Sequence, residues 1–155
     1  MIREEKQLLL KDLSTRLSYG VKILHTGWDC DSDTDFDTVE TLIGIDDRFI
    51  YTVWDKTGDR EKHCLSVSNW KPYLRPMSSM TEEEFVYFMG LRGRMLQSYE
   101  IQSMMKEAFN MPQFIKIGTT LGSYSNKIDW LNAHHFDYRG LIEKGLAIEA
   151  PENMY

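Results

Sequence analysis

A segment with two prolines, residues 71–84, separates a half of the chain with strand patterns from a half with helix patterns. Each proline ring fixes its own φ angle and pushes the residue before it away from helical geometry. Pro72 and Pro76 therefore predict an extended backbone over residues 73–75. We call residues 71–84 the proline joint, because a regular helix cannot continue through its first part.

The end of the proline joint carries a helix start. Thr81 and Glu84 have the spacing of a capping box, in which each side chain bonds a backbone N–H that the first helical turn leaves without a partner. Met80 and Phe85 lie on either side of the box, at the two positions of a hydrophobic staple. These four residues predict a helix that begins after Thr81.

The N-terminal half begins with an amphipathic pattern over residues 4–18. Leu9, Leu13 and Leu17 recur at steps of four, and Gly20 follows as a C-terminal cap. Strand patterns then follow at residues 21–25, 38–45, 49–55 and 62–67. Short connections with turn residues predict an antiparallel meander of four strands, with the N-terminal helix covering one face.

The C-terminal half predicts helices over residues 81–89, 101–108, 125–135 and 137–142, with a short edge strand at 114–117. The expected fold class is therefore α+β: a helix and a four-strand meander over residues 1–70, the proline joint at 71–84, and a mainly helical half over 85–155. The sequence shows no repeat and no linker, so one domain over residues 1–155 is expected.

Composition limits the cellular locations and the classes of partner that we expect for the protein. The charged N-terminus and the short apolar run at residues 8–10 predict neither a signal peptide nor a membrane anchor. Cys30 and Cys64 lie far apart without a Cys-x-x-Cys pair, so reduced thiols and a cytoplasmic location are expected. A net charge of −6 argues against nucleic acid as a partner.

An acidic stretch at residues 29–40 is the sharpest motif. Its spacing matches the twelve-residue calcium loop of an EF-hand, although Thr34 stands where that loop needs glycine and a strand precedes it. The candidate metal ligands are Asp29, Asp31, Asp33, Asp35, Asp37 and Glu40. The alternative is a solvated acidic loop between two strands, whose carboxylates repel each other and stay mobile. No cofactor other than calcium is expected.

No complete catalytic constellation is present, and we assign no catalytic residue. Cys64 directly follows His63, so in a strand the two side chains point to opposite faces and form no thiolate–imidazolium pair. His134 and His135 are adjacent on a helix and cannot both face one metal. Burial of His135 and a capping role for Asp137 are the expected alternative to a site there.

Three segments together resemble a known group of proteins. These are residues 8–13 with 17–21, the stretch KPYLRPMSSMTEE at 71–83, and DWLNAHHFDYRGLI at 129–142 with Ala150 and Pro151. They resemble small uncharacterised proteins encoded in prophages and mobile elements of gut Bacteroides-type bacteria, over about half of this chain. The resemblance implies a cytoplasmic bacterial or phage setting and a small accessory role, and it carries over no catalytic residue.

Three functions follow as hypotheses. The first is a non-catalytic binding or regulatory module with an unknown protein partner. Its expected partner surface comprises Tyr73, Arg75, Met77, Trp130, His134, Tyr138 and Arg139. The second is a metal-dependent hydrolase or calcium-binding protein that uses the acidic stretch at 29–40, with His134 or His135 in the hydrolase. The third is an acidic surface that imitates nucleic acid to block a DNA-binding protein.

Overall fold

The computed structural model describes residues 2–29, 33–64, 69–110 and 124–155, and contacts divide them into two compact units. The sheet unit comprises Met1–Leu74 and Arg139–Tyr155, and the helical unit comprises Arg75–Tyr138. The change from one to the other at Leu74 falls within the proline joint. A single domain over residues 1–155 stays a prediction.

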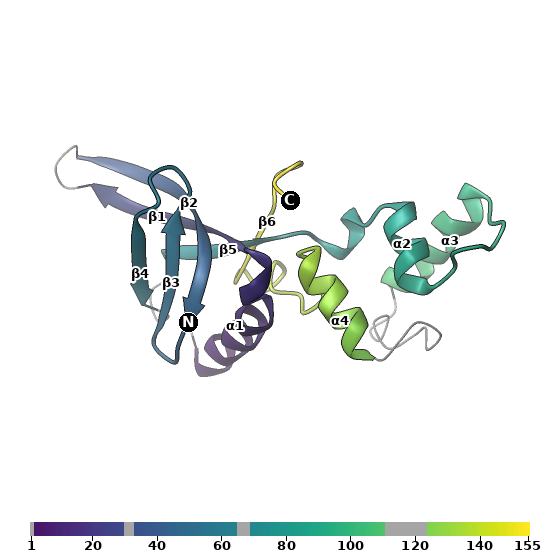
Figure 1. The fold of residues 1–155 in the computed structure, drawn as a ribbon, viewed down its shortest axis with the longest axis horizontal. Helices are drawn as coiled ribbons and strands as arrows, with labels where there is room; N and C mark the ends of the chain where they lie inside the picture. Colours follow the sequence, from purple (N-terminus) through teal and green to yellow (C-terminus); the bar gives the residue numbers. More distant parts are fainter. Residues whose placement is uncertain (1, 30–32, 65–68, 111–123) are drawn as a thin grey trace. The chain divides into compact units, whose positions relative to one another are not determined.

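The described part of the sheet unit forms one mixed sheet of six strands (Figure 1). The strands are β1 (Lys22–Asp29), β2 (Thr34–Ile45), β3 (Phe49–Trp54), β4 (Arg60–Cys64), β5 (Trp70–Leu74) and β6 (Ile148–Glu149). Their order across the sheet is β4-β3-β2-β1-β5-β6. The predicted antiparallel meander of β1 to β4 is confirmed.

Two further strands correct the expected strand count. The prolines predict an extended backbone over residues 73–75. In the structure, residues 73 and 74 are the end of the strand β5, and its first three residues, 70–72, pair antiparallel with β1, with Pro72 opposite Ile23. The short strand β6 then pairs with β5 in parallel. A two-residue strand has no sequence period of its own, so local pattern could not predict β6.

The core of the sheet unit lies between the sheet and α1 (Arg3–Arg16), which confirms the predicted amphipathic helix. Leu9 and Leu13 of α1 pack in one buried cluster with Ile23, Leu42 and Leu74 of the sheet. We call the sheet face that carries these three residues the inner face. A 3-10 turn, Leu17–Tyr19, ends at Gly20, whose φ of 66° is the left-handed conformation expected of a C-terminal cap.

The helical unit contains α2 (Glu82–Met89), α3 (Ser98–Phe109) and α4 (Tyr124–Ala133). The predicted capping box is confirmed, because Thr81 Oγ1 accepts from the N–H of Glu84 and Glu84 Oε2 accepts from the N–H of Thr81. Met80 and Phe85 lie together in the buried core of this unit, as a hydrophobic staple requires. None of the helices in the described segments has the length and apolar character needed to cross a bilayer.

The chain after α4 differs from the prediction. The expected helix over 137–142 is wrong, because the structure has turns there and Gly140 and Gly145 both adopt a φ of 68°. The N–H of Asp137 donates to the carbonyl of Arg75, and the N–H of Arg75 donates to the carbonyl of His135, so these groups do not enter a helix. The edge strand expected at 114–117 lies outside the described residues.

Candidate metal centre

The inner face of the sheet changes from apolar to polar along the strands. His25 of β1 lies opposite Thr38 of β2, and Ile23 lies opposite Glu40, so these four side chains share one face. His63 of β4 lies opposite Ile50 of β3 in the same manner. Strand alternation therefore gathers histidine, glutamate and threonine side chains next to the apolar core.

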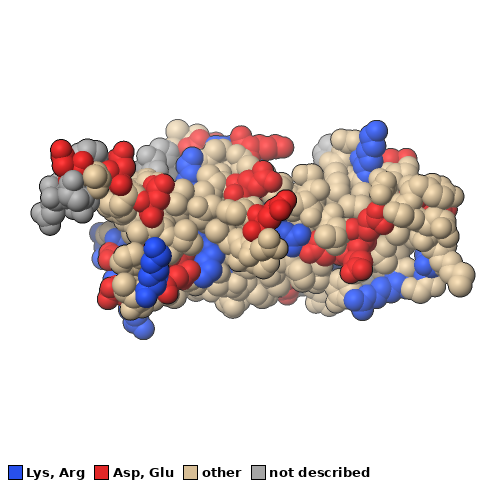
Figure 2. Space-filling view, turned by 90° about the horizontal axis from the view of Figure 1, so that it is seen from above, with Lys and Arg blue, Asp and Glu red and all other residues tan. Residues whose placement is uncertain are grey.

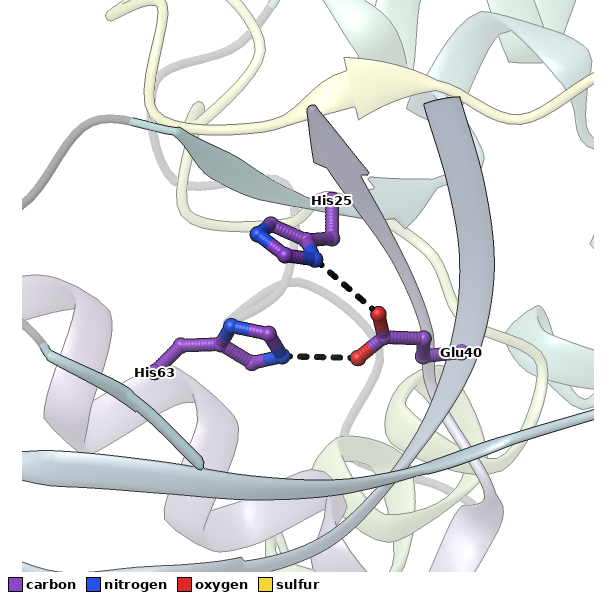
Figure 3. A group of neighbouring side chains, drawn as sticks. All are labelled: His25, Glu40 and His63. Atoms are coloured by element: carbon purple, nitrogen blue, oxygen red, sulfur yellow. Dashed lines mark hydrogen bonds and ion pairs between the residues drawn. The ribbon is translucent and has the colours of Figure 1, made fainter. Parts of the chain in front are cut away.

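Glu40 lies between two imidazoles (Figure 3). Its Oε2 is 2.7 Å from Nε2 of His63, and its Oε1 is 3.2 Å from Nδ1 of His25. The two imidazole ring centres are 4.2 Å apart. One ligand atom from each residue lies within 4.8 Å of the other two, which is the spacing needed to surround one cation.

Two threonines complete the hydrogen bonds of the carboxylate. Thr38 Oγ1 donates to Oε1 of Glu40 at 2.9 Å, and Thr52 Oγ1 donates to Oε2. A carboxylate has about four acceptor positions, and here two hydroxyls and two imidazoles occupy them. Glu40 is therefore held in one orientation.

The tautomer of His25 follows from its second nitrogen. Nδ2 of Asn69 is 3.2 Å from Nε2 of His25, and an amide NH₂ group can only donate. Nε2 then accepts, so the proton resides on Nδ1 and points at Glu40. A cation bound at Nδ1 would move the proton to Nε2, where the oxygen of Asn69 could accept it after the amide rotates.

Burial and hydrogen bonding set the charges of this cluster. The side chains of Glu40 and His63 are 2% and 5% exposed, and that of His25 is 17% exposed. Burial by itself raises the pKa of Glu40, but hydrogen bonds from Thr52, His63 and Thr38 outweigh it and hold the pKa below its usual value. Burial, followed by the neighbouring His63, lowers the pKa of His25. A neutral His25 beside an ionised Glu40 is the state that a metal needs.

Two imidazoles and one carboxylate are a donor set for zinc, iron(II) or cobalt(II), whereas calcium takes oxygen ligands alone. Ligand atoms on a tetrahedral zinc ion lie about 3.4 Å apart, given metal–ligand distances near 2.1 Å. The N···O distances of 2.7 and 3.2 Å are close to that spacing.

Among its described residues, most of the acidic stretch lies in two paired strands and not in the expected loop. Strand β2 begins at Thr34, four residues before the predicted start, and β1 continues to Asp29. Asp33, Asp35 and Asp37 are exposed, and Figure 2 shows acidic side chains at this end of the sheet unit. Within β2, alternation places Asp35 and Asp37 on the face opposite Glu40.

Among the described members of the predicted metal set, Glu40 alone joins the cluster of His25 and His63. Asp31 lies outside the described residues, and calcium binding by the other aspartates stays a prediction. The expected pairing of these carboxylates with His134 or His135 also stays a prediction. Both histidines belong to the helical unit, where His135 is buried as expected and Nδ1 of His134 lies 2.9 Å from the carbonyl of Trp130.

The residues predicted to bind a partner make contacts within each unit. In the helical unit, Arg75 pairs with Glu84 and lies 4.2 Å from the Phe136 ring centre, and Trp130 stacks on His134 at 4.0 Å. Met77 and Tyr138 pack against the core of the same unit. In the sheet unit, the carbonyl of Tyr73 accepts from Tyr155, and Arg139 bonds Asp12. A partner surface at these residues stays a prediction.

Sequence reasoning missed His25 and His63 as site residues. Strand alternation in the sequence places each histidine on the inner face, and this alternation was the one feature from which their inward direction could have been predicted. Their meeting depends on the pairing of four strands, which local pattern does not provide. A scan against models of known protein families, a search of curated proteins and a search of solved structures each found no match for this chain.

Proposed function

We propose that this chain is a small accessory protein that acts by binding, and that its sheet unit binds a divalent transition metal through His25, Glu40 and His63. The observation that supports the metal site is the convergence of three ligand atoms, from three strands, within 4.8 Å of one another. The cytoplasmic and mobile-element setting forms part of the proposal and rests on the sequence resemblance alone.

The surroundings of the cluster support a metal more than an ordinary buried pair. Glu40 accepts from two imidazoles on different oxygens and from a hydroxyl on each, so its carboxylate is fixed between the two candidate nitrogen ligands. Asn69 in turn orients His25, as outer residues orient the ligands of metal sites. The cluster therefore has both an inner set of ligands and a set of residues that position them.

A metal titration tests the proposal. Protein freed of metal with a chelator is titrated with Zn²⁺ by calorimetry and with Co²⁺ by visible absorption, which reports nitrogen and oxygen ligands. We expect one site with a dissociation constant of about 1 μM or tighter, and calcium binding no tighter than roughly millimolar.

Matched variants locate the site. Glu40→Gln, His25→Asn and His63→Asn each remove one ligand and should weaken Zn²⁺ binding roughly 100-fold or more, since loss even of an outer residue costs 10-fold to 100-fold. Asp35→Asn, on the opposite face of the same strand, and His134→Asn, in the helical unit, are the controls and should bind as the wild type does. Equal binding by all five variants would show that the metal lies elsewhere, and no binding by the wild type would reject the metal proposal.

A metal-dependent hydrolase is the second candidate, and one observation favours it. The described residues supply three ligands, and three protein ligands leave a coordination position for water, as in catalytic zinc sites, whereas structural zinc sites use four. Zinc-loaded protein that hydrolyses phosphate or carboxyl esters, with the activity lost in His63→Asn but kept in His134→Asn, would establish the hydrolase. If the protein binds metal but hydrolyses none of these esters, the result supports the proposal that it acts by binding.

A further inference from the structure

The connection between α2 and α3, residues 90–97, forms a hydrogen-bonded turn on the helical unit (Figure 1). The N–H of Leu91 donates to the carbonyl of Val86, and the N–H of Arg94 donates to the carbonyl of Leu91. Leu91 is only 7% exposed and packs in the core of this unit, whereas residues 92–95 are all exposed. The core therefore holds the start of the connection and leaves its tip in solvent.

The tip combines one apolar side chain with two cations. Met95 is 100% exposed, the largest exposed fraction among the described large hydrophobic residues. Arg92 and Arg94 are exposed beside it, and in the described part of the chain neither guanidinium pairs with a carboxylate. Methionine and arginine are both enriched at protein–protein interfaces. We call Arg92, Arg94 and Met95 the knob.

The sheet unit carries a hollow of about 290 Å³ on its outer face, which is the face opposite the inner face and the metal centre. Its lining includes Leu24 and Thr26 of β1, Lys71 of β5 and Ile148 of β6. Leu24 follows the inward-facing Ile23 in β1, so strand alternation directs it outward. A water molecule takes about 30 Å³, so the hollow has room for several waters that an apolar side chain would displace.

Two carboxylates border the hollow on its β2 side. Asp37 lies opposite Thr26 in the β1–β2 pair, and Asp35 follows on the same outer face of β2, about 7 Å along the strand. Both side chains are exposed, and neither pairs with a cation among the residues that the structure describes. Lys71 belongs to β5, on the other side of β1. The β2 side of the hollow is therefore acidic, and we call Asp35 and Asp37 its rim.

We propose that the knob of one molecule docks into the hollow of a second copy of this chain. Met95 enters the hollow, and the two arginines pair with the rim, on the side away from Lys71. Burial of a methionine side chain and charge-assisted hydrogen bonds both stabilise this contact. The pairing of an acidic rim with a basic knob fixes its orientation and favours a second copy over partners of the wrong charge.

The knob belongs to the helical unit and the hollow to the sheet unit, so the contact joins different surfaces of the two copies. Such a heterologous contact forms twice when two copies close around a two-fold axis, and it extends into a chain when they do not. The inference goes beyond the metal proposal and does not depend on it, because the hollow and the metal centre lie on opposite faces of the sheet.

Sedimentation equilibrium of the full, metal-free chain tests the inference. We expect the average mass to rise with protein concentration, with a dissociation constant of about 10–100 μM, because a contact of this size lies at the low end of protein interfaces. Raising NaCl from about 50 mM to about 500 mM should weaken the association several-fold, since salt screens exposed charges. A mass that stays at that of one chain up to about 1 mM rejects the inference, even if the knob binds another protein.

Variants of the knob show whether it makes the contact. Met95→Ser removes the apolar side chain and should weaken self-association roughly tenfold, and Arg92→Glu combined with Arg94→Glu should weaken it roughly 100-fold. Arg3→Glu combined with Lys106→Glu changes the net charge equally at two exposed residues elsewhere, and this control should self-associate as the wild type does. Circular dichroism checks that each variant is folded. Wild-type self-association in the knob variants would place the contact elsewhere and overturn the inference.

A charge exchange between knob and rim gives the sharpest test. Asp35→Lys combined with Asp37→Lys reverses the rim and should weaken self-association as strongly as reversal of the two arginines does. An equal mixture of the two charge-reversed variants should form a complex with one copy of each, within about tenfold of the wild-type affinity, because every knob then meets a rim of opposite charge. A mixture that forms no complex would show that these charges do not face each other and would reject the proposal. None of these results affects the metal proposal.

Discussion

Arg139 donates its Nε–H to Oδ1 of Asp12 at 3.0 Å and so joins the last segment of the chain to the first helix. The same carboxylate accepts two hydrogen bonds from Arg16, at 2.7 and 3.1 Å. Asp12 and Arg16 are both fully buried. One carboxylate thus organises two guanidinium groups from opposite ends of the sequence.

Removal of the Asp12 charge should destabilise the protein strongly. Asp12→Asn leaves the buried Arg16 guanidinium without its anion, and breaking a buried pair in this way costs about 3–5 kcal/mol. Urea unfolding followed by circular dichroism measures the loss. Lys11→Gln, an exposed neighbour on the same helix, is the control and should change the free energy of unfolding by less than about 0.5 kcal/mol. A loss below about 1 kcal/mol for Asp12→Asn would contradict the buried pair as a main support of the sheet unit.

Thr52 should matter for both stability and metal affinity. Its hydroxyl donates to Glu40 and lies 3.1 Å from Nε2 of His63, and the residue is fully buried. Thr52→Val keeps the shape but removes the donor, which costs about 1–3 kcal/mol of folding free energy and roughly tenfold in Zn²⁺ affinity. Thr41→Val, on the opposite face of the sheet, is the matched control for affinity. Unfolding and calorimetric titration of both variants check the prediction, and equal Zn²⁺ affinities would contradict it.

Glu84 should contribute to stability at neutral pH and lose that contribution in acid. Burial raises the pKa of Glu84, but hydrogen bonds from Arg75 and Thr81 outweigh it and lower the pKa from its usual 4.5. A carboxyl with a lowered folded pKa binds its proton more readily when the chain is unfolded, so its stabilisation is present above pH 4.5 and falls as pH falls.

The pH dependence of one variant measures this contribution. The difference in unfolding free energy between wild type and Glu84→Gln should be largest near pH 7 and shrink towards about pH 3. Glu83→Gln, in the same helical turn but exposed, should show a smaller and flatter difference. If the difference in unfolding free energy between wild type and Glu84→Gln stays constant with pH, the charge of the carboxyl does not contribute, and Glu84 acts only through its size and its hydrogen bond to the N–H of Thr81.

Ionisation of the Tyr155 hydroxyl should destabilise the protein at alkaline pH. Its hydroxyl donates to the carbonyl of Tyr73 and accepts from the N–H of Lys22, and burial of this group raises its pKa to about 12 from the usual 10.0. A group with a raised folded pKa stabilises below the unfolded value, so stability is lost as pH rises from about 10 to 12. Unfolding should become easier over that range in the wild type and less so in Tyr155→Phe. Identical alkaline profiles would contradict the raised pKa.

Local chemistry made part of this fold predictable. The capping box needs four consecutive residues, from Thr81 to Glu84, and its hydrogen bonds agree with the prediction. The four-strand meander was predictable because short turns join neighbouring strands. Strand β5 was only half predicted, as an extended segment, because proline is uncommon inside sheets and its pairing with β1 is a long-range contact.

The candidate site was less predictable than the fold for a physical reason. His25 and His63 come together through the register of β1 with β2, β2 with β3 and β3 with β4, and a shift of one residue turns a side chain to the other face. The β2–β3 pairing even contains an irregularity between Leu42 and Gly44. Glu40 was predicted as a ligand, but from the spacing of a loop, whereas residues 34–40 lie in strand β2.

The helical unit interrupts the sequence of the sheet unit, and this has a consequence for protein synthesis. Leu141, Leu146 and Ala147 belong to the core beneath the sheet, and β6 completes its edge. A ribosome must therefore translate residues 139–149 before the strands β1 to β5 obtain their last neighbours, and residues 75–138 are made earlier. The helical unit can therefore finish folding before the sheet unit does. Until residues 139–149 are made, the apolar inner face of the N-terminal strands is incompletely covered.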